Sequence, residues 1–308
     1  MNNFYLAFDF GGTKLSATRL AVGATHWQAQ RRVLSPPGAD ATYDIQTMID
    51  LGRELAAGQR PFAIGVSFGG PVNHQTGTVY LSHHVPRWEN TPLQTILEEA
   101  FAAPVRVDND ANVAALGEYH LGAGQGADSL LYVTVSTGVG GGWILNGRPW
   151  RGHQGLAGEI GHTIADPTGP HCLCGKRGCV ERLASGPYMA QDLAARGVVD
   201  GPITGQRVAD LAAQGQPDAR EILQRGAWAL GVGLGHAANF SNPQRIILGG
   251  GVTKSGDDWW RMVRQTAVAT ALPEIQFDLL PATLGDDAPL WGAISLVQSS
   301  VNHATDHR

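Results

Sequence analysis

The chain has 308 residues, a formal net charge of −5, 43% hydrophobic residues and 16% charged residues. This length fits two domains of about 150 residues each, and the composition indicates a globular protein rather than a disordered one. The acidic balance argues against a nucleic-acid partner, and three cysteines are too few for a disulfide scaffold. Because no secretory signal or membrane-length apolar run is visible, we expect a cytoplasmic protein with no membrane partner.

In the first half of the chain, β-rich apolar runs alternate with segments of helical spacing. Residues 4–8 and 15–20 flank a Gly-Gly-Thr turn, a pattern typical of strand, turn and strand. Apolar periodicity then predicts helices over 43–57 and 93–101. Short apolar runs predict buried strands over 62–67 and 105–107.

The second half repeats this order of elements. An apolar strand over 130–135 leads through a glycine-rich turn into a second run over 143–145, and a strand over 245–248 ends in three glycines. The repetition favours duplicated α/β domains. Residues 122–126 are rich in glycine and are the expected hinge between the halves, and a last amphipathic helix is expected after Pro289.

Two glycine-rich turns are candidate phosphate-binding loops. The first, Asp9-Phe10-Gly11-Gly12-Thr13-Lys14, follows a strand, so its backbone N–H groups can approach phosphate oxygens while Asp9 holds magnesium through water. By itself this turn could equally be a plain hairpin. The second turn, from Thr137 to Gly142, makes phosphate binding the better interpretation, because two such turns facing each other across a cleft would grip a nucleotide.

Carboxylates and amides gather where the strand over 105–107 ends. One Asp or Asn is enough to cap the helix that follows, but this segment reads Asp108-Asn109-Asp110-Ala111-Asn112. The excess indicates a ligand site at the carboxyl end of a strand. Asp110 could accept a proton from a substrate hydroxyl that Asn109 orients.

All the cysteines of the chain lie within eight positions, as Cys172, Cys174 and Cys179. This spacing on a glycine-bent loop supplies three thiolates for a tetrahedral, structural zinc ion. A fourth ligand is required, and the first choice is His162, with His171 and His153 as alternatives. Zinc would fix the loop and so position two neighbouring carboxylates, Glu159 and Glu181.

Together these motifs resemble the ROK family of sugar kinases, repressors and open reading frames, over nearly the whole chain. The likeness lies in the Asp9 to Lys14 turn, the segment Gly65 to Val72, the run Asn109 to Asn112 and the turn Ser136 to Gly142. Its most specific part is Ala157-Gly-Glu-Ile-Gly-His162, followed by Cys172-x-Cys174-Gly-x-x-Gly178-Cys179-x-Glu181.

The resemblance implies an α/β protein with the actin-like, ribonuclease-H-like ATPase fold, in which two α/β domains flank a cleft. The N-terminal domain would span 1–120 and be joined by a C-terminal helix over 289–303. The C-terminal domain would span 121–288 and carry the zinc loop. The resemblance also implies ATP-dependent, Mg²⁺-dependent phosphorylation of a hexose, and a homodimer.

Residue roles follow from the same resemblance. Asp110 would be the general base. The sugar would contact Asn109, Asp110, Glu159, His162 and Glu181. ATP and magnesium would face Asp9, Gly11, Gly12, Thr13, Lys14, Thr137, Gly138 and Gly250. Zinc would be bound by His162, Cys172, Cys174 and Cys179.

The sequence leaves the identity of the sugar open. Phosphorylation of glucose to glucose 6-phosphate is the leading expectation, with fructose, mannose, N-acetylmannosamine and N-acetylglucosamine as alternatives. Relatives often carry Asn-x-Pro-Gly-Trp where this chain has His84-Val85-Pro86-Arg87-Trp88, so His84 could contact the sugar, or His83 and His84 could simply be surface residues.

Two other classes of function are alternatives to a kinase. A repressor of the family would need a helix-turn-helix before the first strand, which begins by residue 4. A sugar-responsive regulator without kinase chemistry is the other alternative, and the presence of Asp110 argues against it.

Overall fold

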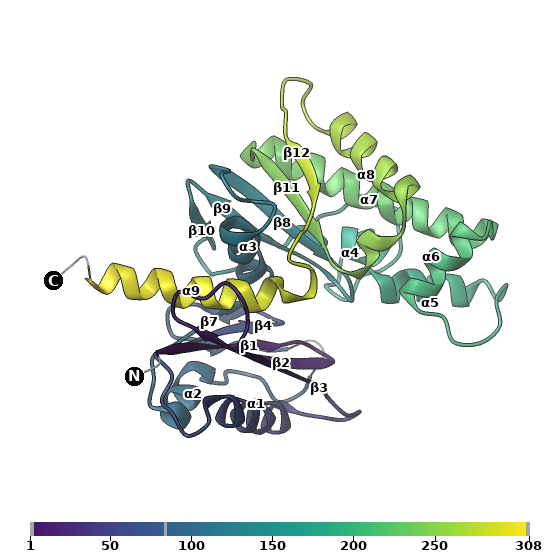
Figure 1. Ribbon diagram of the computed structural model, residues 1–308. Helices are drawn as coiled ribbons and strands as arrows, with labels where there is room; N and C mark the ends of the chain where they lie inside the picture. The colour runs from purple at the N-terminus through teal and green to yellow at the C-terminus, as the bar shows by residue number, and fades with distance from the viewer. Residues whose placement is uncertain (1–2, 83–84, 306–308) are drawn as a thin grey trace. The chain divides into compact units, whose positions relative to one another are not determined.

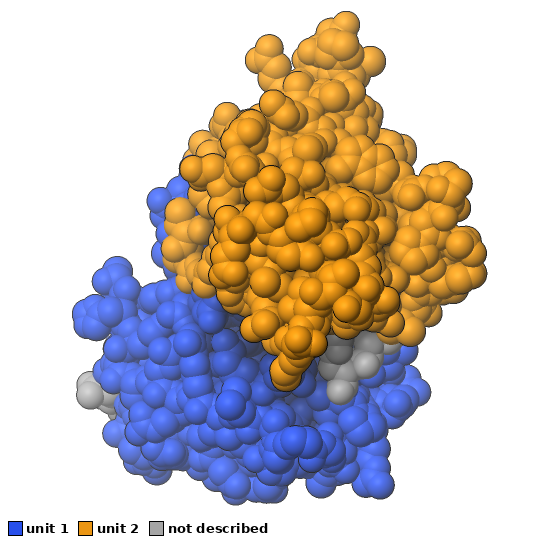
Figure 2. All heavy atoms as spheres, turned by 90° about the vertical axis from the view of Figure 1, so that its right-hand side faces the viewer, with its two compact units in different colours: residues 1–125, 151–157, 286–308 blue, residues 126–150, 158–285 orange. Residues whose placement is uncertain are grey.

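The computed structural model describes residues 3–82 and 85–305, and the chain divides into two compact units (Figures 1 and 2). Unit 1 comprises Met1–Gln125, Arg151–Ala157 and Asp286–Arg308, and unit 2 comprises Gly126–Trp150 and Gly158–Gly285. The first boundary therefore falls inside the glycine-rich stretch expected to be a hinge. Residues 151–157 also belong to unit 1, which the sequence did not predict.

Unit 1 is built on a five-stranded sheet with the order β3-β2-β1-β4-β7. Its strands are β1 (Phe4–Phe10), β2 (Lys14–Ala21), β3 (Ala29–Leu34), β4 (Ala63–Phe68) and β7 (Val105–Asn109). The first three strands pair antiparallel, whereas β1, β4 and β7 run parallel, so the ends of these three strands meet at one edge. There Asp9 of β1 lies in register with Ser67 of β4.

Helices cover both faces of this sheet, as the alternation of side chains along β1 requires. Phe4, Leu6 and Phe8 belong to the core on the side of α1 (Ala41–Ala56) and α2 (Leu93–Phe101). Tyr5 and Ala7 belong to the core on the other side, with α3 (Asp110–Leu121) and α9 (Ala288–Thr305). Because successive strand residues point to opposite faces, one strand serves both cores. The short strands β5 (Val72–Asn73) and β6 (Thr78–Val79) form a separate ribbon.

Unit 2 repeats the same topology, with the strand order β10-β9-β8-β11-β12. Its strands are β8 (Ser129–Val135), β9 (Val139–Leu145), β10 (Arg148–Trp150), β11 (Arg245–Gly249) and β12 (Asp278–Pro281). Again the first three are antiparallel and the last two run parallel to β8. The two halves of the chain thus share one sheet topology, in line with the repeated pattern of the sequence.

The helices of unit 2 are more numerous than the sequence analysis suggested. They are α4 (Val180–Ala184), α5 (Gly186–Ala195), α6 (Gly205–Ala213), α7 (Pro217–Ser241) and α8 (Asp257–Thr270). Short 3₁₀ helices span Ile160–His162, Gly251–Lys254 and Gly285–Asp287. Within the described ranges, no helix combines the length and apolar character needed to cross a bilayer.

Candidate functional site

The first glycine-rich turn connects β1 to β2 in unit 1. The N–H of Gly11 donates to the carbonyl of Lys14 at 3.1 Å, and a Cβ added to Gly11 would lie 2.9 Å from that oxygen, so the tight turn requires a glycine there. Thr13 is exposed at the tip. The ammonium group of Lys14 lies 3.4 Å from Asp286, which belongs to the same unit.

The Asp9 carboxylate lies at the start of this turn. Its Oδ1 accepts a hydrogen bond of 2.8 Å from the Ser67 hydroxyl. Burial raises the pKa of Asp9 to about 6, although the Ser67 hydrogen bond and the positive charge of Lys14 oppose that rise. A half-buried carboxylate at the start of this glycine-rich turn is suited to a hydrated magnesium ion, which also favours the ionised form.

The predicted catalytic segment lies where β7 passes into α3. Asn109 caps α3, since its Oδ1 accepts from the N–H groups of Ala111 and Asn112 at 3.0 and 3.3 Å. Its Nδ2 donates to the carbonyl of Gly70 at 3.1 Å and to Oδ1 of Asp110 at 3.0 Å. The cap residue therefore also orients the neighbouring carboxylate.

Gly69 lies between Asp110 and the first glycine-rich turn. A Cβ added to Gly69 would lie 3.2 Å from the carbonyl oxygen of Phe10, 3.9 Å from Cα of Gly11 and 3.8 Å from Oδ2 of Asp110. Asp110 Oδ1 accepts from the N–H of Ala111 at 2.8 Å, within the first turn of a helix, where negative charge is stabilised. A candidate base and a candidate phosphate loop thus lie side by side in unit 1.

A buried ion pair between Asp108 and Arg151 holds the segment around Asn109. Asp108 Oδ2 lies 2.6 Å from Nε of Arg151, and its Oδ1 accepts from the N–H of Asn109 at 2.8 Å and from Nδ2 of Asn112 at 3.3 Å. Arg151 belongs to the segment that returns to unit 1. The ion pair joins residues 43 positions apart, so no local sequence signal could have identified it.

The second glycine-rich turn connects β8 to β9 in unit 2. Glu181 Oε2 accepts a hydrogen bond of 3.0 Å from the N–H of Val139, and a Cβ added to Gly138 would lie 2.7 Å from the same oxygen. The N–H of Gly186 donates to the carbonyl of Ser136 at 2.9 Å. Glu181, predicted as a sugar ligand, is therefore in contact with a predicted phosphate loop.

Next to this turn, unit 2 contains a mostly apolar cavity of about 770 Å³. Ser136 and Thr137 contribute to its lining, together with residues of α5, α6, the loop 201–204 between them and the segment 251–255. Gly250, just before that helix, has φ +89°, and a Cβ there would collide with the backbone of Val135. Only a glycine lets the chain pass β8 so closely. The volume and apolar lining suit a small organic ligand such as a nucleoside.

His162 and the three cysteines form one cluster. One ligand atom from each of these four residues lies within 4.8 Å of the others. Cys172 Sγ lies 3.9 Å from His162 Nδ1, and Cys174 Sγ lies 3.5 Å from Cys179 Sγ. Of the three candidate histidines, His162 is the one in this cluster, whereas Nε2 of His171 lies 2.8 Å from Arg177.

The cluster has the spacing and chemistry of a tetrahedral zinc site. Zn–S bonds of about 2.3 Å place sulfurs about 3.8 Å apart, close to the 3.5 Å between the sulfurs of Cys174 and Cys179. Without a cation, burial and then the neighbouring sulfurs raise the pKa of the Cys179 thiol to about 12, and burial raises that of Cys172. A divalent cation would reverse this by stabilising the thiolates. Bound through Nδ1, His162 would keep its Nε2 edge for another partner.

The sequence-predicted residues thus fall into two groups. Unit 1 contains the first phosphate turn, Asn109 and Asp110. Unit 2 contains the second turn, Gly250, Glu159, Glu181 and the Cys/His cluster, with Glu159 exposed just before the 3₁₀ helix Ile160–His162. The predicted sugar contact of His84 lies outside the described residues. Sequence reasoning missed Ser67 and Arg151, whose partners Asp9 and Asp108 lie on segments distant in sequence.

Comparison with known proteins points to one family. The chain matches the model of the ROK family over residues 5–300. It is 34% identical to a glucokinase of Halalkalibacterium halodurans, over 98% of this chain and 97% of that protein. It is also 34% identical to an N-acetylmannosamine kinase of Shigella boydii, over 95% of this chain and 98% of that one.

A solved structure gives the same result. A ROK-family glucokinase from Streptomyces griseus, in complex with glucose and AMPPNP, is similar with a TM-score of 0.80 and 31% identity. The match covers 94% of this chain and 98% of that one. The chain therefore belongs to the ROK family, and the expectation of an actin-like α/β ATPase fold is confirmed.

Proposed function

We propose that this protein is an ATP-dependent sugar kinase that phosphorylates a hexose, with glucose as the leading substrate and glucose 6-phosphate as the product. The observation that carries the proposal is the meeting of Asp110 Oδ2 and the first phosphate turn around Gly69. A base beside a phosphate loop is what transfer of a phosphoryl group to a hydroxyl requires. The names of the similar proteins support the same reaction.

The nucleotide is assigned to the two glycine-rich turns and the cavity of unit 2. The apolar cavity would hold the base and ribose beside Thr137 and Gly138, and Gly11 to Lys14 would offer backbone N–H groups and a cation to the phosphates. Asp9 would hold Mg²⁺ through water, and this ion would neutralise charge on the phosphate oxygens.

Asp110 acts as the general base in this scheme. Asn109 holds Oδ1 of Asp110, and Oδ2 accepts the proton of the sugar hydroxyl as its oxygen bonds to the γ-phosphorus. The bond between that phosphorus and the β-γ bridging oxygen breaks, and ADP leaves with the electron pair. Because the transition state is loose, the protein contributes mainly alignment and charge stabilisation.

Glu159, Glu181 and His162 are assigned to sugar hydroxyls. Glu181 contacts the second phosphate turn through Val139, so a sugar on this carboxylate would lie next to the nucleotide phosphates. We assign a structural Zn²⁺ to His162, Cys172, Cys174 and Cys179, because it would fix the loop on which these sugar ligands depend.

The decisive experiment measures sugar-dependent ADP release with a panel of hexoses and N-acetylhexosamines. The similarity to an N-acetylmannosamine kinase keeps N-acetylmannosamine in the panel, with fructose, mannose and N-acetylglucosamine. The Asp110→Asn variant should lose turnover by about 10²-fold or more while it still binds ATP and sugar. The matched control is Asp50→Asn, an exposed carboxylate on α1. Turnover of Asp110→Asn near that of the control would refute the role of Asp110, and a wild type inactive with every sugar would refute the kinase.

We also propose a homodimer, which the resemblance implies. Light scattering coupled to size exclusion tests it directly, since a monomer mass across the micromolar range would contradict it.

A further inference from the structure

Arg182 is a buried cation that uses all three of its guanidinium nitrogens. It follows Glu181 on α4 and is 8% exposed. Nε donates to the backbone carbonyl of His171 at 3.1 Å, while Nη1 and Nη2 donate to the two carboxylate oxygens of Asp192 at 3.2 and 2.7 Å. Such a bidentate pair fixes orientation as well as distance.

Arg182 and its two partners connect the Cys/His loop of unit 2 with the helix that lines the cavity. His171 precedes Cys172 in the Cys/His loop, and Glu181 contacts the second phosphate turn. Asp192 lies on α5, the helix from which Ala190, Gln191 and Ala194 line the cavity. One side chain therefore connects the loop and the helix of the proposed sugar ligands to a wall of the proposed nucleotide cavity.

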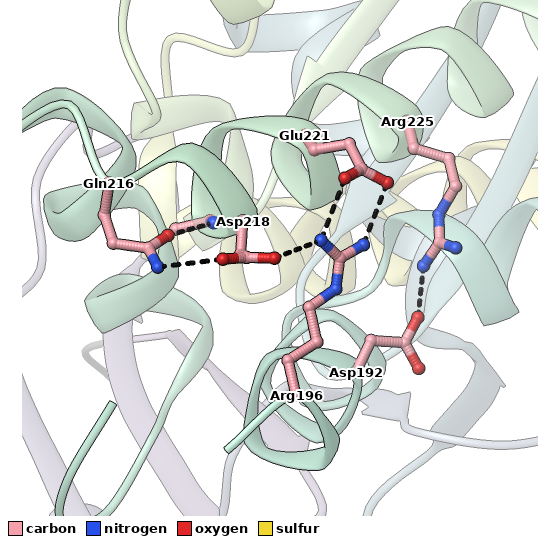
Figure 3. Close-up of polar contacts among 7 residues, drawn as sticks. Asp192, Arg196, Gln216, Asp218, Glu221 and Arg225 are labelled. Carbon is pink, nitrogen blue, oxygen red and sulfur yellow. Dashed lines mark hydrogen bonds and ion pairs between the residues drawn. The ribbon is translucent and has the colours of Figure 1, made fainter. Parts of the chain in front are cut away.

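Asp192 is itself held from a second direction. Arg225 of α7 also donates to its Oδ2, as Figure 3 shows. Asp192 is 17% exposed in its side chain, so this cluster is largely shielded from water. Loss of Asp192 would leave both arginines without their carboxylate, and loss of Arg182 would leave Asp192 with Arg225 alone, which does not restore the bidentate geometry.

A second arginine, Arg196 at the C-terminal cap of α5, also makes two ion pairs, which are more exposed than the Arg182–Asp192 pair. Arg196, at the end of α5, pairs with Asp218 at 2.6 Å and with Glu221 at 2.8 Å (Figure 3). Neither partner lines the cavity or contacts the Cys/His loop. A substitution of Arg196 therefore measures how much stability is lost when an ion pair between α5 and α7 is weakened.

We propose that Arg182 and Asp192 form a positioning pair, which holds Glu181 and the Cys/His loop at a fixed spacing from the helix that lines the nucleotide cavity. The inference rests on the proposed function. Because phosphoryl transfer depends on the alignment of donor and acceptor, a shift of this spacing affects both substrates together.

The test compares Arg182→Lys, Asp192→Asn and the double variant with Arg196→Lys as control. Lysine keeps the charge but cannot donate to His171 and to both Asp192 oxygens at once. Steady-state kinetics would be measured with each substrate varied, thermal unfolding would report folding, and calorimetry would measure AMPPNP affinity without sugar. We expect kcat/KM for sugar and for ATP to fall by about 10-fold or more in each single variant.

The double variant should lose less than the product of the two single losses, since both changes break the Arg182–Asp192 pair, while each also alters a separate contact, with His171 or with Arg225. Arg196→Lys should stay within about twofold of wild type after correction for the folded fraction. The inference is overturned if Arg182→Lys loses no more than this control at equal thermal stability, or if only one substrate is affected with AMPPNP affinity unchanged. A wild type without sugar-dependent turnover would instead refute the proposed function.

Discussion

Replacing Arg151 by methionine should destabilise unit 1 far more than the loss of an ordinary surface ion pair. Arg151 Nε lies 2.6 Å from Oδ2 of Asp108, and the two side chains are 17% and 2% exposed. The Arg151→Met variant leaves the Asp108 carboxylate buried with hydrogen bonds from Asn109 and Asn112 alone. Breaking a buried pair in this way costs about 3–5 kcal/mol.

Arg31→Met provides the matched control in the same unit. Arg31 lies 2.7 Å from Glu54, but these side chains are 48% and 53% exposed, so its loss should cost about 1 kcal/mol or less. Urea denaturation followed by circular dichroism would measure both. The Asp108→Asn/Arg151→Met double variant should recover part of the loss, because the uncompensated charge is gone.

The Arg151→Met variant should also lose turnover, since Asp108 holds the peptide N–H of Asn109, next to the proposed base. A free-energy loss below about 1 kcal/mol, equal to that of Arg31→Met, would refute the reasoning that burial makes this pair important. A stable variant with normal turnover would also show that the segment 151–157 does not support the Asp110 loop.

Three further predictions concern other parts of the site. With the pKa of Asp9 at about 6, kcat/KM for ATP should fall as pH drops below 6, because magnesium binding needs the ionised carboxylate. The Ser67→Ala variant removes a hydrogen bond that lowers the pKa of Asp9, so the acid limb of the profile should move to higher pH. A pH profile unchanged by this substitution would contradict the prediction. Gly250→Ala should lower thermal stability by about 1–3 kcal/mol and raise KM for ATP, whereas Gly251→Ala, with open space at its Cβ, should leave stability unchanged. Cys179→Ser should carry less than one zinc per chain and unfold at lower temperature; elemental analysis that finds no zinc in the wild type would refute the metal site.

Local patterns were enough to predict much of the fold. The continuous apolar run over 4–8 and the repeated strand-turn-strand pattern near residue 130 correspond to β1, β2, β8 and β9. Some predicted strand ends were too early, because the prediction followed apolar side chains alone. The strand predicted over 105–107 continues to Asn109, since the polar residues at its end still pair with β4. The helices α4 to α8 of unit 2 were not predicted, and α4 and α5 are too short to show a long periodic pattern.

Clusters of chemically active residues could also be identified from the sequence where their members lie close together in the chain. The sequence by itself determined that three cysteines on a glycine-bent loop could offer thiolates to one metal ion, and that Asn109 and Asp110 follow a strand. It left three histidines as candidates for the fourth ligand. The tertiary structure places His162 of these three in the cysteine cluster, since the hydrogen bond from the N–H of Val180 to the carbonyl of Thr163 brings the 3₁₀ helix Ile160–His162 against the cysteine loop.

Contacts between distant segments were beyond the reach of the sequence. The pairs Asp108–Arg151 and Arg182–Asp192, and the meeting of Asp110 with the first phosphate turn at Gly69, each join separate elements. No periodicity or spacing encodes them, because they depend on how sheets and helices pack. The sequence determined which chemical groups the protein has and which local structures hold them, and only the tertiary structure decided which of those groups face one another.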